Sequence, residues 1–343
     1  MKFTITRFIS EQWNPVPEVV QTSLEGKTVI VTGANNGIGF EAAKHFARMN
    51  PGRLIMACRS QQRGEEAVSN LKRETGYSNV ELWMLDLASF ASVQTFSERF
   101  NKEGGRLDIL VENAGILPEK TFKLTDDGWE PVFQVNNLST SLLALLLLPR
   151  LVETAQKYQT TPRLVIVSSE MHFVTTIDEA VLENDNPLAM FGSSEQYIQG
   201  ALKTRYEDSK LLNVFFARAL NEKIRHQALI INSVTPGYCY SSLRKNFSGL
   251  RAWVDWLMEK ALARTAEEGS RQLIWAAVGG ADDEEALRGA YISLAQIREP
   301  SDYVVERKDV QDKLWENLLD ELIKIDASIQ DIREEHFKQS AEA

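Results

Sequence analysis

The chain has 343 residues, 43% of them hydrophobic, which suits one large α/β domain or two ordinary domains. Its formal net charge of −10 argues against a nucleic-acid surface, which needs clustered lysine and arginine, and against electrostatic docking on anionic lipid. The 2 cysteines cannot build a disulfide framework and indicate a reducing compartment, and the 4 scattered histidines show no metal-ligand spacing, so we expect no metal site.

The pattern of apolar residues predicts no segment that inserts into a membrane. Residues 1–21 carry charges and prolines but no apolar core of signal-peptide length. The most apolar window, Leu142–Leu148, ends at Pro149 and falls far short of the roughly 20 residues that span a bilayer. We therefore expect a cytoplasmic protein without membrane contact.

After an N-terminal extension of weak structure, residues 1–25, predicted strands and helices alternate along the chain. The strands are expected at 27–32, 53–58, 79–85, 107–111, 163–167, 228–234 and 289–294. The helices are expected at about 38–49, 61–75, 90–101, 126–157, 197–223, 266–278 and 309–337. Several strands are near-continuous apolar runs, as in a sheet covered on both faces. This order predicts a doubly wound, Rossmann-type parallel sheet with helices on both faces, in a single domain of residues 26–300 that precedes a C-terminal helical tail, residues 301–343.

A glycine-rich turn, residues 32–39 (Thr-Gly-Ala-Asn-Asn-Gly-Ile-Gly), joins the first strand of this pattern to its first helix. Such a turn aims backbone N–H groups at a phosphate, and its glycines remove the Cβ atoms that would hold a pyrophosphate away. The turn is therefore a candidate dinucleotide cradle, although the same glycines could also serve plain tight-turn geometry.

Other polar segments also follow predicted strands, and in an open parallel sheet these strand ends converge on one crevice. They are Arg59-Ser60, Asp86-Leu87, Asn113-Ala114-Gly115, Ser168-Ser169 and Pro236-Gly237.

A site for NAD usually holds an acidic residue about 20 residues after the glycines, where it binds the ribose 2′-OH. Arg59 stands there instead, and a cation suits a 2′-phosphate. We therefore predict NADP(H) as the cofactor, with a plain surface arginine as the alternative.

Tyr206 and Lys210 are spaced i and i+4 in a predicted helix, so they share one face. A free tyrosine has a pKa of about 10, and a nearby cation lowers that pKa by favouring the phenolate. The pair is a candidate general acid/base, although this spacing is also common on solvated helix faces.

Ser169 is a candidate hydrogen-bond donor to a substrate oxygen. Ser168 points to the opposite face of its strand, and spacing alone leaves open which of the two serines is structural.

Taken together, these residues resemble the short-chain dehydrogenase/reductase family over about residues 27–241. The family's Thr-Gly-x-x-x-Gly-x-Gly pattern is matched by Thr32, Gly33, Gly37 and Gly39. Its Asn-Ala-Gly turn is matched by Asn113-Ala114-Gly115, and its active-site tetrad is matched by Asn136, Ser169, Tyr206 and Lys210. The turn around Arg59 and the long tail are most similar to the NADP-dependent, retinol-dehydrogenase-like branch.

The resemblance implies a mechanism and a set of cofactor contacts. Tyr206 passes a proton to or from the substrate oxygen, and Lys210 lowers the tyrosine pKa and holds the nicotinamide ribose. Ser169 polarises the carbonyl, Asn136 keeps a water in a proton relay, and the nicotinamide carries the hydride. Asp86 is expected near the adenine, and the loop from Pro236 to Ser241 is expected to close on the nicotinamide. The implied cofactor contacts are Gly33, Asn35, Asn36, Gly37, Ile38, Gly39, Arg59, Ser60, Asp86, Leu87, Asn113, Ala114, Gly115, Tyr206, Lys210, Pro236, Gly237 and Ser241.

The chain departs from the family pattern at three places. Glu112 stands where many relatives have a second asparagine, and Asn137-Leu138-Ser139 replaces an end that usually contains glycine. Ser169 and Tyr206 are separated by 36 residues, more than relatives commonly have. Within this insertion, residues 183–187 (Glu-Asn-Asp-Asn-Pro) predict a turn. The insertion either borders the substrate mouth or forms a surface excursion, and the sequence leaves both open.

The segment after Pro236, about residues 238–265, is rich in apolar and aromatic residues such as Tyr238, Trp253 and Trp256. In relatives this segment covers the substrate, so we predict a lid over a hydrophobic small molecule. The alternatives are an amphipathic helix packed on the core and, less expected, contact with a membrane surface. The helix around Leu142–Leu148 often forms a dimer interface in relatives, so a homodimer is allowed unless the C-terminal helix blocks it.

These observations predict an NADP(H)-dependent oxidoreductase of secondary metabolism that interconverts a carbonyl and an alcohol on a hydrophobic small molecule. A family member repurposed for a non-redox biosynthetic step and a non-catalytic NADP(H)-binding protein are the alternatives. An intact set of Ser169, Tyr206 and Lys210 argues against the second of these.

Overall fold

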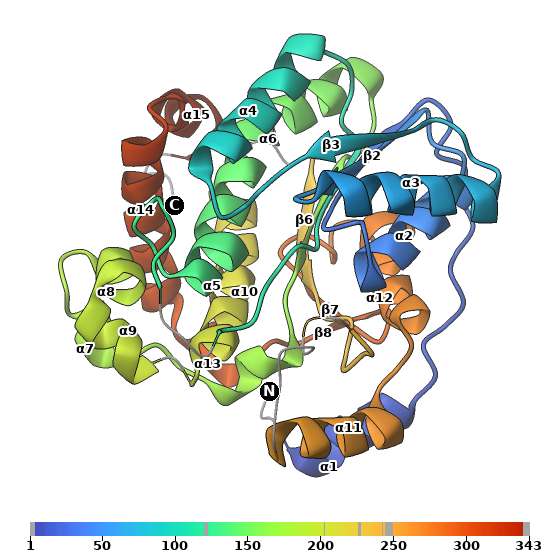
Figure 1. The fold of residues 1–343 in the computed structure, drawn as a ribbon. Coiled ribbons are helices and arrows are strands. Elements are labelled where there is room, and N and C mark those ends of the chain that lie inside the picture. Colours follow the sequence, from blue (N-terminus) through green and yellow to red (C-terminus); the bar gives the residue numbers. More distant parts are fainter. Residues whose placement is uncertain are drawn as a thin grey trace.

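The computed structural model describes residues 4–119, 123–201, 203–225, 228–241, 243 and 250–338. Their strands form one sheet in the order β3-β2-β1-β4-β5-β6-β7-β8, and all neighbours are parallel except β7 and β8 (Figure 1). The strands are β1 (Thr28–Thr32), β2 (Arg53–Cys58), β3 (Val80–Met84), β4 (Ile109–Glu112), β5 (Arg163–Val167), β6 (Ile230–Val234), β7 (Tyr291–Ser293) and β8 (Gln296–Arg298). This order confirms the predicted doubly wound sheet of Rossmann type.

Helices cover both faces of this sheet. Those in the first half of the chain are α1 (Ile5–Trp13), α2 (Gly37–Arg48), α3 (Gln61–Thr75), α4 (Phe90–Glu103), α5 (Pro131–Phe133), the π-helical turn η1 (Gln134–Leu138) and α6 (Ser139–Tyr158). Those that follow β5 are the 3₁₀ helix η2 (Glu170–Val174), α7 (Glu179–Leu182), α8 (Pro187–Ser193), α9 (Glu195–Ala201) and α10 (Arg205–Lys223). The remaining ones are α11 (Leu250–Leu262), α12 (Ala266–Val278), α13 (Asp302–Glu306), α14 (Lys308–Ile325) and α15 (Ser328–His336).

Alternation along the strands divides the core into two layers. In β1, Val29 and Val31 face the layer that α2, α3 and α12 form, whereas Ile30 faces the layer of α4, α6 and α10. The helical run Pro131–Tyr158 is long and apolar enough to cross a membrane, but 83% of its most apolar window is buried inside the protein. It is the central helix of the second layer.

The structure corrects several predicted boundaries, each for a local or tertiary reason. The extension is not weakly structured throughout, because Thr4 caps α1 by accepting a hydrogen bond from Arg7 N. The helix predicted from residue 126 begins at Pro131, because the Glu130 carboxylate accepts hydrogen bonds from Val132 N and Phe133 N. The helix predicted at 197–223 is divided into α9 and α10, and β8 was not predicted.

The C-terminal helices pack on the body of the protein. The predicted helix at 309–337 is divided into α14 and α15, and the turn between them is held by Asp326, which accepts hydrogen bonds from Ser328 N (3.0 Å) and Gln94 Nε2 (3.0 Å). Helix α14 contacts α8 and α10, and α15 contacts α6. Trp315 and Phe337 are both buried in the core, with ring centroids 5.1 Å apart. These helices therefore cover the outer surface of α6 and α10 (Figure 1).

Candidate active site

The glycine-rich turn is joined to the loop after β4. The Thr32 hydroxyl accepts hydrogen bonds from both Asn113 N and Ala114 N (3.0 Å each), and Asn113 Nδ2 donates to Thr32 O (2.9 Å). A Cβ added to Gly39 would lie 2.4 Å from Asn113 Nδ2, so only glycine fits there. Gly37 has φ +55°, and no atom of the described residues beyond its chain neighbours and its own helix backbone lies within 4 Å of the position that a Cβ would take there, so the described part of the chain leaves the outer side of the turn open. This geometry fits a phosphate cradle.

The remaining residues of the turn lie before or within the first turn of α2. Asn35 is half-buried, Asn36 is exposed and precedes α2 as its N-cap, and Ile38 lies in the first turn of that helix. Gly33 has φ +65°, and a Cβ there would approach Ala114 Cα to 3.0 Å. The backbone therefore passes so close to the loop after β4 that packing alone requires glycine at positions 33 and 39.

Arg59, Ser60, Asp86 and Leu87 follow β2 and β3 and lie side by side across these neighbouring strands. Leu85 N donates to Cys58 O (2.9 Å), which aligns the two strand ends. Arg59 is exposed, whereas Leu87 is buried. Burial raises the pKa of the Cys58 thiol to about 11, although a contact with the Ala34 backbone opposes this. Cys58 is thus a neutral packing residue that ties the end of β2 to the glycine-rich turn.

Three of the predicted catalytic residues meet beyond the end of β4. Asn136 lies in η1, and its Oδ1 accepts a hydrogen bond from Ile116 N (2.9 Å). A Cβ added to Gly115 would lie 3.2 Å from Asn136 Oδ1 and 3.6 Å from Lys210 Nζ. Lys210 Nζ in turn lies 5.7 Å from the centre of the Tyr206 ring. The structure therefore brings Asn136, Tyr206 and Lys210 together around Gly115.

Lys210 is buried, and burial lowers its pKa to about 8. Its ammonium donates a hydrogen bond to Val167 O (2.9 Å), the last residue of β5. With a pKa of about 8 the lysine is still mostly charged at pH 7, so its ammonium can favour the phenolate of a neighbouring tyrosine.

The structure separates the two serines that follow β5. Ser168 is buried, and its hydroxyl donates to Lys210 O (2.7 Å), so it ties the strand to α10. Ser169 is half-buried, and its hydroxyl accepts a hydrogen bond from Met171 N (3.2 Å) at the start of η2. Ser168 therefore has the structural role, which leaves Ser169 as the candidate for substrate contact.

Residues that depart from the family pattern have clear packing roles here. Asn137 Nδ2 donates to Ser209 O (2.8 Å) and to Asn213 Oδ1 (2.7 Å), so it joins η1 to α10. Asn136 Nδ2 donates to Ser209 Oγ (3.0 Å) beside it. These paired amides hold the π-helical turn against the helix that carries Tyr206 and Lys210.

Glu112 is buried at the end of β4, and neither carboxylate oxygen has a hydrogen-bond partner among the described residues. Burial raises its pKa well above the ordinary value, so the folded protein binds a proton that the unfolded chain releases above about pH 4.3. Stability therefore falls as the pH rises above that value.

We expect Glu112→Gln to flatten this fall in stability between about pH 5 and about pH 8, as measured by urea unfolding. The exposed control Glu98→Gln should keep the wild-type slope, and an unchanged slope in Glu112→Gln would contradict the assignment.

The described residues of the insertion between Ser169 and Tyr206, 170–201 and 203–205, are folded and packed. Residues 183–186 form the predicted turn, and Pro187 begins α8. Leu188 N donates to Asn317 Oδ1 of α14 (2.8 Å). At the end of the insertion Arg205 is fully buried, with its guanidinium 4.0 Å from the centre of the Phe191 ring. The described part of the insertion is therefore packed on α14 and on the core, and its place at the substrate mouth stays a prediction.

The loop after β6 approaches the glycine-rich turn through α12. A Cβ added to Gly269 would lie 2.5 Å from Cys239 Sγ and 3.5 Å from both Ile38 Cγ1 and Pro236 Cβ. Ser241 lies further along this loop, where its hydroxyl accepts a hydrogen bond from Leu243 N (3.3 Å).

Three residues near this loop were missed by the sequence analysis. Gly269 was not predicted as a site residue, although a glycine inside a predicted helix is a signal of close packing. Gln12 and Arg264 also contact this loop, and nothing in the sequence pattern indicates them.

A separate hollow, partly open to solvent, lies between η1, α10 and α14. Leu212, Phe216 and Trp315 line it, together with Asn137. None of the predicted catalytic residues lines this hollow, so it is distinct from the candidate active site.

The sheet order, the glycine cradle and the cluster around Gly115 define a Rossmann-type dinucleotide-binding oxidoreductase. Residues 27–181 match the family model for short chain dehydrogenases. The short chain dehydrogenase/reductase dmxR8 of Cryptosporiopsis sp. (strain 8999) is 35% identical over 303 residues, which cover 87% of this chain and 90% of the relative. The short-chain dehydrogenase anuD of Penicillium roqueforti is 36% identical over 324 residues, which cover 91% and 82%. The chain belongs to the short-chain dehydrogenase/reductase family.

Solved structures share this fold. A short chain dehydrogenase of Shigella flexneri 2a, complexed with NADP, aligns with a TM-score of 0.56 and 22% identity, covering 79% of this chain and 98% of the other. At this level of identity the likeness concerns the fold.

Proposed function

We propose that this protein is an NADP(H)-dependent oxidoreductase that interconverts a carbonyl and an alcohol on a hydrophobic small molecule. The observation that carries the proposal is the convergence of Asn136, Tyr206 and Lys210 around Gly115, directly beyond the loop that closes on the glycine-rich turn. A proton-transfer group thus lies beside a cradle suited to a dinucleotide.

In this proposal each residue has one task. Tyr206 donates a proton to, or accepts one from, the substrate oxygen, and the Lys210 ammonium favours the phenolate. Ser169 donates a hydrogen bond that orients the same oxygen, and Asn136 holds η1 in place for a water in the proton relay. The nicotinamide, when bound, would supply or accept the hydride. The glycine-rich turn would hold its pyrophosphate, and Asp86 would lie near the adenine.

The substrate is proposed to be hydrophobic because the loop after β6 and the helix α11 that follows it carry several aromatic side chains. Trp253 and Trp256 on α11 are 58% and 53% exposed, so they do not belong to the core and are accessible to a ligand. The expected lack of membrane contact and the cytoplasmic location stay predictions from the sequence. A homodimer through α6 would have to displace α15, which packs on that helix, so we propose that this surface is not used for dimerisation.

The test is to incubate the purified protein with NADPH and a panel of hydrophobic ketones and aldehydes and to follow the loss of NADPH absorbance. Turnover of any carbonyl supports the proposal. NADPH binding without turnover of the panel would favour a non-catalytic binding protein, and conversion of a substrate without change in NADPH would favour a non-redox step.

The exposed position of Arg59 predicts the cofactor preference. Because a charge-assisted hydrogen bond to a 2′-phosphate is worth about 1.5–3 kcal/mol, Arg59→Ala should weaken NADPH binding about tenfold or more and leave NADH binding unchanged. Fluorescence titration with both cofactors measures this. Arg73→Ala, which removes an arginine that is 69% exposed at the other end of α3, is the control. Tighter binding of NADH than NADPH by the wild type would contradict the prediction.

A further inference from the structure

Helix α1 lies outside the sheet, beside α11 (Figure 1). Arg264 Nη2 donates hydrogen bonds to Asn14 O (3.1 Å) and to Glu11 O, two carbonyls at the end of α1. Trp13 Nε1 also donates to Ala261 O of α11 (3.2 Å). Arg264 itself is buried, so this contact is shielded from solvent.

The backbone of Arg264 is paired with the loop that follows β6. Arg264 N donates to Tyr238 O (2.9 Å), and Tyr240 N donates to Arg264 O (2.8 Å). A Cβ added to Gly237 would lie 2.5 Å from Arg264 Nη1, so the guanidinium lies directly against Gly237. One residue therefore joins the end of α1 to the loop predicted to close on the nicotinamide.

Gln12 makes the second contact from α1 to this loop. Its side chain is buried, and Oε1 accepts a hydrogen bond from Tyr238 N (3.3 Å). Gln12 also lies near Glu170, the residue after Ser169. Burial raises the pKa of Glu170 to about 7, whereas Arg264 and Gln12 favour its ionised form. The tip of α1 thus reaches the space between Ser169 and the loop at Gly237.

We propose that α1 is a clasp for the loop at residues 236–240, with Gln12 and Arg264 as positioning residues for the nicotinamide side of the cofactor site. The inference rests on the proposed function. Gly237 has φ +77° and the loop lies beyond the end of β6, so the loop has little regular structure of its own to order it. Ordering the loop before the cofactor arrives reduces the entropy lost on binding, which strengthens binding.

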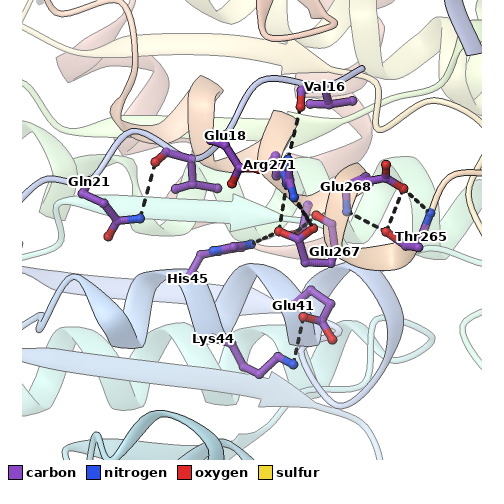
Figure 2. Close-up of polar contacts among 12 residues, drawn as sticks. Val16, Glu18, Gln21, Glu41, Lys44, His45, Thr265, Glu267, Glu268 and Arg271 are labelled. Atoms are coloured by element: carbon purple, nitrogen blue, oxygen red, sulfur yellow. Dashed lines mark hydrogen bonds and ion pairs between the residues drawn. The ribbon is translucent and has the colours of Figure 1, made fainter. Parts of the chain in front are cut away.

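The matched control is a second arginine that holds the same N-terminal segment further from the loop. Arg271 Nη1 donates to Val16 O (3.2 Å) and pairs with Glu18 (3.1 Å), and its guanidinium also binds Glu267 (Figure 2). Arg271→Met therefore loosens the extension without touching Gly237, Tyr238 or Tyr240.

The first experiment measures hydrogen exchange of residues 236–241 in the protein without cofactor. Arg264→Met and Gln12→Met should speed exchange of the Tyr238 and Tyr240 amides, whereas Arg271→Met should leave it at the wild-type rate. Gln12→Met is the milder change, so it keeps the test decisive if Arg264→Met does not fold. Wild-type exchange in folded Gln12→Met and Arg264→Met, or equal acceleration in Arg271→Met, would overturn the clasp.

The second experiment measures NADPH affinity and turnover with the same variants. Arg264→Met should raise Kd and KM for NADPH about tenfold, while kcat changes less than about threefold because Ser169, Tyr206 and Lys210 are intact. Arg264→Lys should restore part of the affinity, since an ammonium can still donate to Asn14 O. A lower kcat at unchanged KM would overturn the positioning role. If the wild type does not bind NADPH, the proposed function fails, while the exchange result still judges the clasp.

Discussion

Replacing Tyr206 by Phe is expected to lower kcat at least about a thousandfold, the upper part of the range for loss of a general acid/base. The phenolic hydroxyl is the only group that this change removes, and the ring keeps its place 5.7 Å from Lys210 Nζ. NADPH affinity should therefore stay within about threefold of the wild-type value, because the glycine-rich turn is untouched. Single-turnover and steady-state NADPH oxidation, with a fluorescence titration for binding, measure both quantities.

Tyr158→Phe is the matched control for this experiment. Tyr158 is 39% exposed at the end of α6, on a surface away from Gly115, so loss of its hydroxyl should leave kcat unchanged. Full turnover by Tyr206→Phe would remove the acid/base assignment. Equal losses in the two variants would point to a general effect on the fold instead.

Replacing Gly39 by Ala should lower the free energy of unfolding by about 3 kcal/mol, in the range for overpacking a tight interior. The new Cβ would lie 2.4 Å from Asn113 Nδ2 and 2.6 Å from Gly33 O, and one of these is a backbone atom that cannot rotate away. Moving Asn113 would break its hydrogen bond to Thr32 O (2.9 Å), which holds the cradle to β4. NADPH affinity should fall more than about tenfold. Urea unfolding and fluorescence titration test the two effects.

Gly200→Ala is the control for added volume. Among the described residues, no atom outside its own helix backbone lies within 4 Å of the Cβ that it would add in α9. Stability should therefore be unchanged or slightly higher, since alanine favours helix over glycine by about 1 kcal/mol. If Gly39→Ala unfolded at the same urea concentration as the wild type and bound NADPH equally well, the close approach of the turn to Asn113 would have no energetic importance.

The parallel sheet could be predicted because its signals are local. Strands such as β2 and β5 are short apolar runs bounded by polar residues, and the structure places them at the predicted residues 53–58 and 163–167. Helix α12 likewise begins and ends at the predicted residues 266 and 278, since Thr265 and Glu268 form a capping box at its start. Some of the boundaries that were wrong depend on contacts from elsewhere, as with the Asp326 turn that Gln94 stabilises, whereas the caps at Thr4 and Glu130 are local.

The candidate site divides in the same way. The glycine-rich turn and the pair Tyr206 and Lys210 are spaced in the sequence as their chemistry requires, so pattern alone indicates them. The choice between Ser168 and Ser169 needed the hydrogen bond from Ser168 to Lys210 O, which joins residues far apart in the chain. Gln12 and Arg264 could not be predicted, because α1 reaches the loop at Gly237 only through the packing of α1 against α11.

The sequence by itself determined the doubly wound sheet, the glycine-rich turn and the spacing of the residues proposed for proton transfer. These features depend on apolar periodicity, backbone freedom at glycine and helical repeat, all of which operate within a few residues. Only the tertiary structure decided that Lys210 is buried, that Glu112 lacks a polar partner among the described residues, and that α1 holds the loop at Gly237. Burial and long-range hydrogen bonds arise when distant segments pack together, so no local pattern encodes them.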